Sequence, residues 1–226
     1  MNKERNIIDF YLLATKLKDI IRTGWNEEHW HIQKERIESV AEHVYGVLIL
    51  AIGIYSEYKP SLDFDRVLKM LIVHELEEVL IGDITPYQGV SQEEKMQMGH
   101  EAIKKVLSSL IDKDIYYDLI IEFDQHETVE SLFAYQCDKL EADIMSKYYQ
   151  DNGFHRDINN QEGNIAMKSK RVQNIISNGA LTAFDIWYNV DKELYRDDIF
   201  KELLEYVRSN DLKIKGEEMN DKILSL

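Results

Sequence analysis

Residues that interrupt helices are scarce in this sequence, and their scarcity is its strongest constraint on the fold. The chain of 226 residues holds two prolines and ten glycines. Between them, apolar residues recur three and four positions apart, a spacing that places them on one face of a helix. Alternation of apolar and polar residues, which would indicate strands, never extends beyond a few positions. The sequence therefore predicts an all-α fold.

Capping and breaking residues divide the chain into helices. Asp63 and Ser91 stand where the third and fourth helices should begin, and Ser91 has Glu94 at the spacing of a capping box. Gly82 stands where the third helix should end, because glycine readily adopts the left-handed conformation that commonly follows a helix. On this basis we expect helices over residues 5–22, 39–58, 64–81, 91–110, 114–126, 128–150, 165–178, 181–192 and 195–208.

The charge of the chain excludes several classes of partner. Its 42 acidic residues and 27 lysines and arginines give a formal net charge of −15. Such a surface repels a nucleic-acid duplex or an anionic membrane, whereas a small anionic substrate can still bind beside a local cation. The single Cys137 excludes an internal disulfide and a cysteine-based zinc site. Because there is no secretion signal and no apolar run approaching about 18 residues, we expect a cytoplasmic protein with no membrane partner.

Ionisable residues crowd the end of the third predicted helix. Residues 73–83 read VHELEEVLIGD, with one histidine and four carboxylates. Charged groups on a buried helix face are costly unless they are paired or bound to a metal. His74 and Glu78 continue the apolar stripe and should point to the interior, while Glu75 should lie about 100° further round the helix. We expect Glu77 to lie on a solvated face.

Two other predicted helices each present a metal-capable side chain on an apolar face. His43 lies between Val40 and Val47 on one of them, and Asp138 shares a face with Ala134 on the other. A single histidine of this kind is more often an ordinary core residue, so the inference depends on the combination. Imidazole suits Zn, Fe, Co and Ni, and carboxylate suits Mn and Mg, so the mixed set predicts one divalent metal ion without identifying it.

A cation held in this way would support phosphoryl chemistry. It can polarise a phosphoryl oxygen and lower the pKa of a bound water toward neutrality. Glu78 and Asp83 are spare carboxylates that could orient that water or move its proton. Other catalytic motifs do not match: His74-Glu75 begins like a zincin motif but lacks the second histidine, and no glycine-rich phosphate loop or serine nucleophile motif occurs.

Four blocks of the sequence resemble the HD-domain metal-dependent phosphohydrolases, and in particular their 5'-deoxynucleotidase branch. The blocks are RTGW at 22–25, RIESVAEH at 36–43, HELEEVLIGDITP at 74–86 and DKLE at 138–141. The resemblance implies a helical HD-domain bundle, commonly a homodimer, with its core over residues 1–150. Residues 151–226 lie outside the resemblance, and their predicted helices lead us to expect a helical extension that packs on this core. It also implies an enzyme that removes the 5'-phosphate of a (deoxy)nucleoside monophosphate.

The resemblance also implies roles for the matching residues. Metal ligation would fall to His43, His74, Glu75 and Asp138. The acidic pair near the substrate phosphate would be Glu78 and Asp83. Substrate binding would fall to Arg22, Trp25 and Arg36. Arg22 would hold the phosphate, and Trp25 could stack on a base. The alternative for residues 23–37 is a surface loop that its tryptophans anchor to the protein.

One residue departs from the pattern of that family, which has a His-Asp doublet where this chain has His74-Glu75. Glutamate reaches one methylene farther, and a metal site holds its ligand distances to about ±0.2 Å. Glu75 could therefore ligate in an adjusted geometry or accept a hydrogen bond from a metal-bound water. Two other functions stay open: hydrolysis of a nucleoside triphosphate or signalling nucleotide, and nucleotide binding with weakened catalysis.

Overall fold

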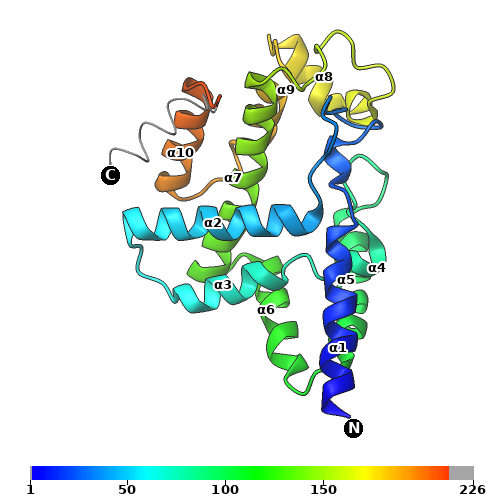
Figure 1. Cartoon of the computed structure of the whole chain (residues 1–226). Coiled ribbons are helices and arrows are strands. Elements are labelled where there is room, and N and C mark those ends of the chain that lie inside the picture. The colour runs from blue at the N-terminus through cyan, green and yellow to red at the C-terminus, as the bar shows by residue number, and fades with distance from the viewer. Residues whose placement is uncertain (1, 214–226) are drawn as a thin grey trace, which may run out of the picture.

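The protein is a bundle of α-helices, as a computed structural model covering residues 2–213 shows (Figure 1). No strand occurs within those residues, so the predicted all-α class is confirmed. Short 3₁₀ turns extend or precede several helices, at Thr15–Lys18, Thr23–Trp25, Leu107–Ser109 and Ile165–Lys168. The helices are α1 (Lys3–Ala14), α2 (Val40–Tyr58), α3 (Phe64–Val73), α4 (Glu78–Ile81), α5 (Gln92–Val106), α6 (Lys113–Gln125), α7 (Val129–Asp151), α8 (Lys170–Ser177), α9 (Ala183–Asp191) and α10 (Asp198–Ser209).

The predicted helix caps are present. The Asp63 side chain accepts a hydrogen bond from the Arg66 amide at the start of α3, and Ser91 forms a capping box with Glu94 at the start of α5. Gly82 ends α4 with φ +76°, a backbone conformation that side chains other than glycine rarely adopt. Most helix boundaries lie within a few residues of the expected ones. The first helix is shorter than predicted, since α1 ends at Ala14 and a 3₁₀ turn continues only to Lys18.

Helix α7 is the centre of the bundle. It packs against α2, α3, α6, α9 and α10, and in Figure 1 it runs through the middle of the molecule while α2 crosses it. Small and apolar side chains such as Ala134, Cys137 and Leu140 bury one side of α7 in the main hydrophobic cluster. Many residues of α7 are therefore buried, including polar ones such as Asp138 and Glu141.

The C-terminal helices complete the hydrophobic clusters formed by α7. Phe184 of α9 and Phe200 of α10 lie in the same cluster as Val47 of α2. A separate cluster joins Tyr149 of α7 with Ile186 of α9. The helices after residue 150 thus share their buried surface with α7, and the division into a core and an extension stays a prediction.

Helix α2 has the length and the apolar composition that would suffice to cross a membrane. It packs against α3 and α7, however, and carries the fully buried His43 near its start. A core helix meets the same criteria of length and composition, so these criteria alone carry little weight here.

The predicted single helix over 64–81 is interrupted, and this part of the prediction is wrong. Helix α3 ends at Val73, residues 74–77 form turns, and α4 begins at Glu78. Within the interruption, amide groups bond to carbonyls three residues back, for example Glu78 N to Glu75 O at 3.1 Å. Such bonds wind the backbone more tightly than an α-helix and rotate the side chains that follow to new directions.

Candidate metal centre

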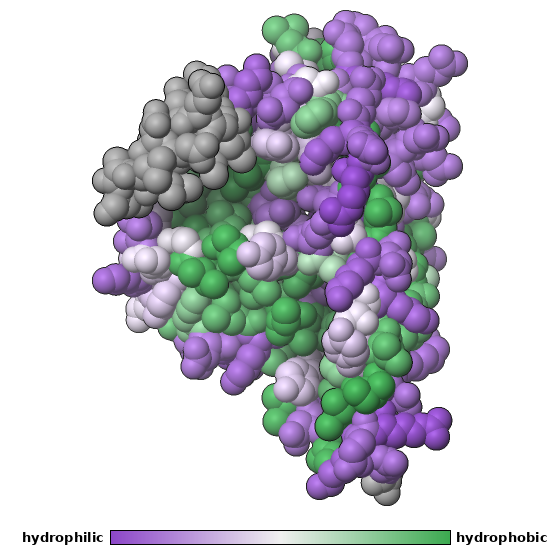
Figure 2. Space-filling view, in the orientation of Figure 1, coloured by the Kyte–Doolittle hydropathy of each residue, from purple (hydrophilic) through white to green (hydrophobic). Residues whose placement is uncertain are grey.

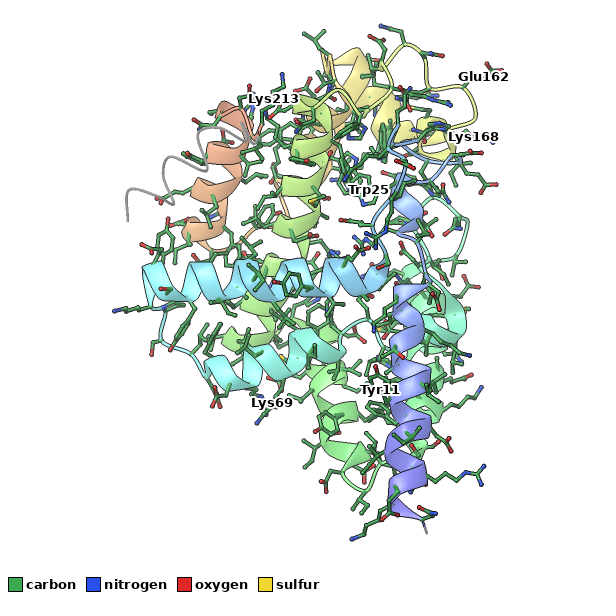
Figure 3. All side chains as sticks on the ribbon, in the orientation of Figure 1. Tyr11, Trp25, Lys69, Glu162, Lys168 and Lys213 are labelled. Atoms are coloured by element: carbon green, nitrogen blue, oxygen red, sulfur yellow. The ribbon has the colours of Figure 1, made fainter. Side chains whose placement is uncertain are left out.

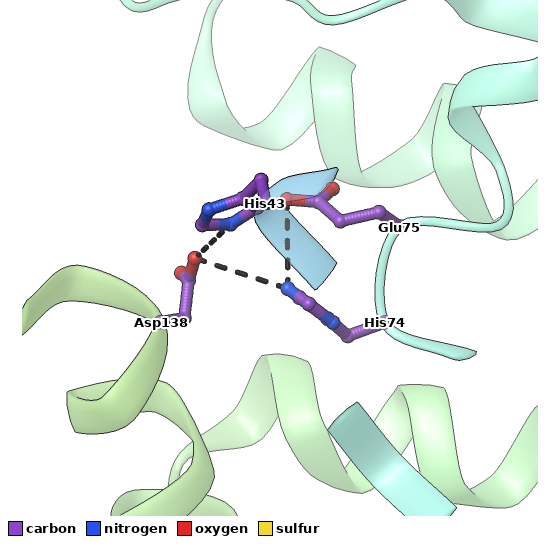
Figure 4. A group of neighbouring side chains, drawn as sticks. All are labelled: His43, His74, Glu75 and Asp138. Atoms are coloured by element: carbon purple, nitrogen blue, oxygen red, sulfur yellow. Dashed lines mark hydrogen bonds and ion pairs between the residues drawn. The ribbon is translucent and has the colours of Figure 1, made fainter. Parts of the chain in front are cut away.

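Four of the predicted residues converge at one point. His43 comes from α2, His74 and Glu75 come from the turn between α3 and α4, and Asp138 comes from α7 (Figure 4). One nitrogen or oxygen atom of each lies within 4.8 Å of the corresponding atoms of the others. Three elements far apart in sequence therefore supply two imidazoles and two carboxylates to one small space.

The distances within this group are short on every side. His43 Nε2 lies 2.9 Å from Asp138 Oδ1 and 3.9 Å from Glu75 Oε1. His74 Nε2 lies 3.8 Å from the same Asp138 oxygen and 3.6 Å from the same Glu75 oxygen. One oxygen of each carboxylate thus faces both imidazole Nε2 atoms. We call these four residues the ligand cluster.

His74 is the member that most clearly lacks a protein partner. Its Nδ1 lies 2.7 Å from the Leu71 carbonyl oxygen, which can only accept, so Nδ1 carries the proton. Its Nε2 is buried and has no hydrogen-bond partner among the described residues. A buried nitrogen of this kind is costly unless something binds it. A divalent metal ion fits: two imidazole nitrogens and two carboxylate oxygens are a suitable donor set.

His43 is held from both sides. Its Nδ1 lies 2.5 Å from Glu141 Oε2, opposite the contact between its Nε2 and Asp138. Burial and the nearby Arg22 lower the pKa of His43, but the two carboxylates outweigh them and raise it to about 9. Because a metal ligand must be deprotonated, a cation at Nε2 would have to displace a proton there.

The two carboxylates of the ligand cluster are ionised. Burial acts to raise the pKa of Asp138, but Lys139 and the hydrogen bond from His43 lower it well below its usual value. Lys139 Nζ lies 2.9 Å from Asp138 Oδ2 and leaves Oδ1 to face the imidazoles. Burial likewise opposes ionisation of Glu75, and the charges of neighbouring groups, His74 foremost, lower its pKa. Both side chains can therefore supply an anionic oxygen.

Arg22 lies at the edge of the ligand cluster. Its Nη1 is 3.7 Å from Glu75 Oε1, and its side chain is 15% exposed. The backbone here is anchored, because the Arg22 amide donates to the Glu38 carbonyl and Ile21 forms an isolated antiparallel β-bridge with Ser39. The positively charged Arg22 thus borders the ligand cluster and keeps some access to solvent.

Glu78 and Asp83 lie beside the cluster in different environments. Glu78 is 1% exposed, its Oε1 lies 3.9 Å from Lys95 Nζ, and its Oε2 has no partner among the described residues. Burial, together with Glu75 and Asp83, raises the pKa of Glu78 well above its usual value. Asp83 instead accepts a 2.6 Å hydrogen bond from the Thr23 amide, which ties it to the segment that carries Arg22.

Glu77 does not lie on a solvated face, contrary to the prediction. Its Oε2 atom is buried and has no hydrogen-bond partner among the described residues. Burial, followed by the charge of Glu75, raises its pKa well above the usual value. The prediction assumed a continuous helix, and the tight turn at residues 74–77 redirects this side chain inward.

The structure does not bring Trp25 and Arg36 into the ligand cluster. Trp25, labelled in Figure 3, is 1% exposed, stacks on Trp187 at 4.7 Å between ring centroids, and donates through Nε1 to Glu38. Arg36 pairs at 2.6 Å with Glu42, and both are exposed. Arg36 also lines a cavity of about 440 Å³. Contact of either residue with a substrate stays a prediction.

Two residues that the sequence interpretation left without a role contact the cluster directly. Glu141 binds His43, and Lys139 binds Asp138. Both belong to the DKLE block. Glu141 follows Asp138 by three positions on α7, so the helical spacing places Asp138 and Glu141 on one face. That spacing was the available signal, but the partner on α2 could not be identified without the fold.

Comparisons with known proteins give a consistent family. The model of the HD domain family matches residues 14–178. The 5'-deoxynucleotidase HDDC2 of Bos taurus is 33% identical over 150 residues, which cover 65% of this chain and 69% of that protein. The 5'-deoxynucleotidase hdd1 of Schizosaccharomyces pombe is 33% identical over 62% of this chain and 70% of its own length.

Solved structures show the same fold. One is a predicted metal-dependent phosphohydrolase from Magnetospirillum magnetotacticum, with a TM-score of 0.62 and 19% identity over 92% of this chain and 93% of its own. The PH0347 protein from Pyrococcus horikoshii has a TM-score of 0.61 and 22% identity over 89% of this chain and 96% of its own. The helical arrangement is therefore that of a known group of structures.

We predict that His74→Ala removes divalent metal binding. Loss of an outer-shell partner alone typically costs about 10–100-fold in metal affinity, so loss of this donor should cost at least about 100-fold. The measurement is metal content by mass spectrometry after loading with Mn²⁺ or Co²⁺ and dialysis. His100→Ala is the control, because His100 pairs with Asp124 outside the cluster. Equal metal content in both variants and the unaltered protein would contradict the prediction.

Proposed function

The chain belongs to the HD domain family, and from this premise we propose that it is a metal-dependent phosphohydrolase that removes the 5'-phosphate of deoxynucleoside monophosphates. The observation that carries the proposal is the ligand cluster, two imidazoles and two carboxylates within 4.8 Å of one another, with Arg22 at its edge. The 5'-deoxynucleotidases among its relatives support the choice of reaction and substrate.

The ligand cluster would hold one divalent cation, through His43, His74, Asp138 and Glu75. When bound, such a cation polarises the phosphoryl group and makes a water more acidic. Its charge also offsets the two carboxylates, which would otherwise repel a phosphate. The donor set is compatible with Mn, Co, Fe, Ni, Zn or Mg.

Arg22 is the residue we assign to the substrate phosphate. Its guanidinium is a planar donor that matches phosphate oxygens in a bidentate geometry. It lies next to Glu75 and remains partly exposed, so a phosphate can approach both the cation site and this side chain. Because the Arg22 backbone is already held by its hydrogen bond to Glu38, only the side chain has to be ordered when a phosphate binds.

Glu78 and Asp83 divide the proton handling in this proposal. Because the pKa of Glu78 is raised well above its usual value, its carboxyl can retain a proton and give it to the departing 5'-oxygen. Asp83 is fixed by the Thr23 amide, and its other oxygen can orient the attacking water. Water then supplies the new oxygen on phosphorus and passes a proton to Asp83, while the bond from phosphorus to the 5'-oxygen breaks and Glu78 protonates the departing oxygen.

We expect the purified protein to release inorganic phosphate from deoxynucleoside monophosphates, and chelation to abolish the release. Glu78→Gln should lower the rate by about 10²–10⁴-fold, the usual contribution of a general acid or base, with metal content unchanged. Glu101→Gln, an exposed residue of α5, is the matched control. A phosphate assay over a panel of mono- and triphosphates measures this. Release of triphosphate or pyrophosphate would instead favour a triphosphatase or signalling-nucleotide hydrolase.

Glu75 separates the proposal from a nucleotide-binding protein with weakened catalysis. Its Oε1 faces both imidazole Nε2 atoms but also lies 3.7 Å from Arg22, so the same oxygen contacts the cation site and the substrate-binding side chain. Catalysis requires that this sharing leave the oxygen available to a metal. If Glu75 stayed paired with Arg22, or held the cation in the wrong position, the protein would bind nucleotide but hydrolyse it only weakly.

We predict that Glu75→Asp lowers phosphate release at least about tenfold. The shorter side chain withdraws its carboxylate by about 1.5 Å, far outside the ±0.2 Å tolerance of a metal ligand. The turn at residues 74–77 places the backbone for the longer glutamate side chain, so an aspartate there would not reach the same point. Activity and metal content are measured together, with Glu101→Asp as the control. Higher activity in Glu75→Asp, with nucleotide-induced thermal stabilisation of the unaltered protein, would establish the weakened homologue instead.

The assembly and compartment are part of the same proposal. Apolar side chains gather on the face that α2 and α3 form (Figure 2), where Tyr45, Ile49, Ile52 and Ile72 are all about half exposed or more. We assign this face to a homodimer contact, because exposed apolar patches mark interaction sites. The single buried Cys137, with no internal disulfide partner in the sequence, fits a reducing compartment such as the cytoplasm.

We expect light scattering to give a mass of about twice 26.6 kDa for the unaltered protein. Ile49→Asp should shift the mass to that of one chain, because a charge would be buried in the contact. Leu181→Asp, which alters a more exposed apolar residue outside this face, should leave the dimer intact. A single-chain mass for the unaltered protein at all concentrations would contradict the assignment.

A further inference from the structure

Glu141 is a buried carboxylate that contacts the ligand cluster from behind. It lies on α7 one turn after Asp138 and is 7% exposed. Its Oε2 is 2.5 Å from His43 Nδ1, on the side of the imidazole ring away from the cluster. Because the carboxylate oxygen is the acceptor of this hydrogen bond, His43 Nδ1 donates the proton, and Nε2 is the atom that faces Asp138 and Glu75.

Gly46 makes room for this contact. It lies on α2, one turn after His43, where α2 faces α7. A Cβ atom at this position would lie 2.5 Å from Glu141 Oε1 and 3.2 Å and 3.3 Å from the next two carbons of that side chain. Atoms do not approach so closely, so any other residue at position 46 would displace the carboxylate.

A second glycine of the same helix shows that this arrangement is local. Gly53 has nothing within 4 Å of its ideal Cβ position, so alanine could replace it without any clash. Glycine inside a helix is otherwise destabilising compared with alanine. The steric need at position 46 is thus tied to Glu141, and no such need exists at position 53.

From these contacts we propose that Glu141 is a positioning residue, which orients His43 for metal ligation and depends on Gly46 for its space. Metal-bound histidines typically donate their second ring N–H to a carboxylate or carbonyl, which fixes the ring and its tautomer. His74 has such a partner in the Leu71 carbonyl, and Glu141 gives His43 the equivalent one. The inference rests on the proposed metal function and adds a residue that touches neither metal nor substrate.

The test measures the binding of Co²⁺ alone, with calorimetry for the affinity and the visible spectrum of the bound ion for its coordination. We expect Glu141→Ala to weaken Co²⁺ binding about 10–100-fold and to change the spectrum at saturation, because the His43 ring is no longer fixed. Glu141→Gln, whose side-chain oxygen can still accept from Nδ1, should lose less. Circular dichroism checks that each variant is folded.

Gly46→Ala supplies an independent arm with a matched control. It leaves every charged group in place, yet it should displace Glu141 and weaken Co²⁺ binding in the same direction as Glu141→Ala. Gly53→Ala, the same substitution in the same helix, should bind Co²⁺ as the unaltered protein does. A loss common to both glycine variants would point to a general effect on α2 and overturn the proposal.

The outcomes separate this proposal from the proposed function. If the unaltered protein binds Co²⁺ and both Glu141→Ala and Gly46→Ala match it in affinity and spectrum, the positioning role is wrong and the metal function stands. If the unaltered protein binds no divalent ion, both are overturned. Should Glu141→Ala fail to fold, Glu141→Gln and Gly46→Ala decide the matter by the same two measurements.

Discussion

The packing of α2 against α7 is the interaction on which the rest of the site depends. It places His43 of one helix between Asp138 and Glu141 of the other, so that one imidazole joins two buried carboxylates. Buried charges are tolerated only when they are paired and hydrogen bonded in good geometry. The contact must therefore be close and exact, and a glycine on α2 gives the space that it needs.

Charge balance explains why the site has the composition that it has. Four ionisable side chains form the ligand cluster, with Glu78 and Asp83 beside it, in a chain that carries a net charge of −15. Arg22 and Lys139 are the cations that contact cluster carboxylates directly in the described structure. A bound divalent cation would complete this balance. The raised pKa of Glu78 is the counterpart of the same crowding, because a carboxyl that stays neutral adds no further charge.

The interruption between α3 and α4 reconciles the glutamate of the His-Glu doublet with the cluster. In a continuous helix Glu75 would lie about 100° from His74. In the turn that replaces the helix here, its Oε1 lies 3.6 Å from His74 Nε2. Next to this turn, Glu78 is buried and one carboxylate oxygen of Glu77 is buried as well. The longer side chain and the turn are best regarded as one feature of this protein.

The helical class, most helix boundaries and the candidate ligands could be predicted from the sequence, because caps and apolar spacing act over a few residues. Its resemblance to one family placed the four ligands in a single site before any contact was known. Three contacts became visible only in the folded chain: Glu75 faces the imidazoles, Trp25 stacks on Trp187, and Glu141 is the partner of His43. Periodicity indicates which face of a helix is buried but not what meets it. Contacts between residues 95 or more positions apart depend on how whole helices cross.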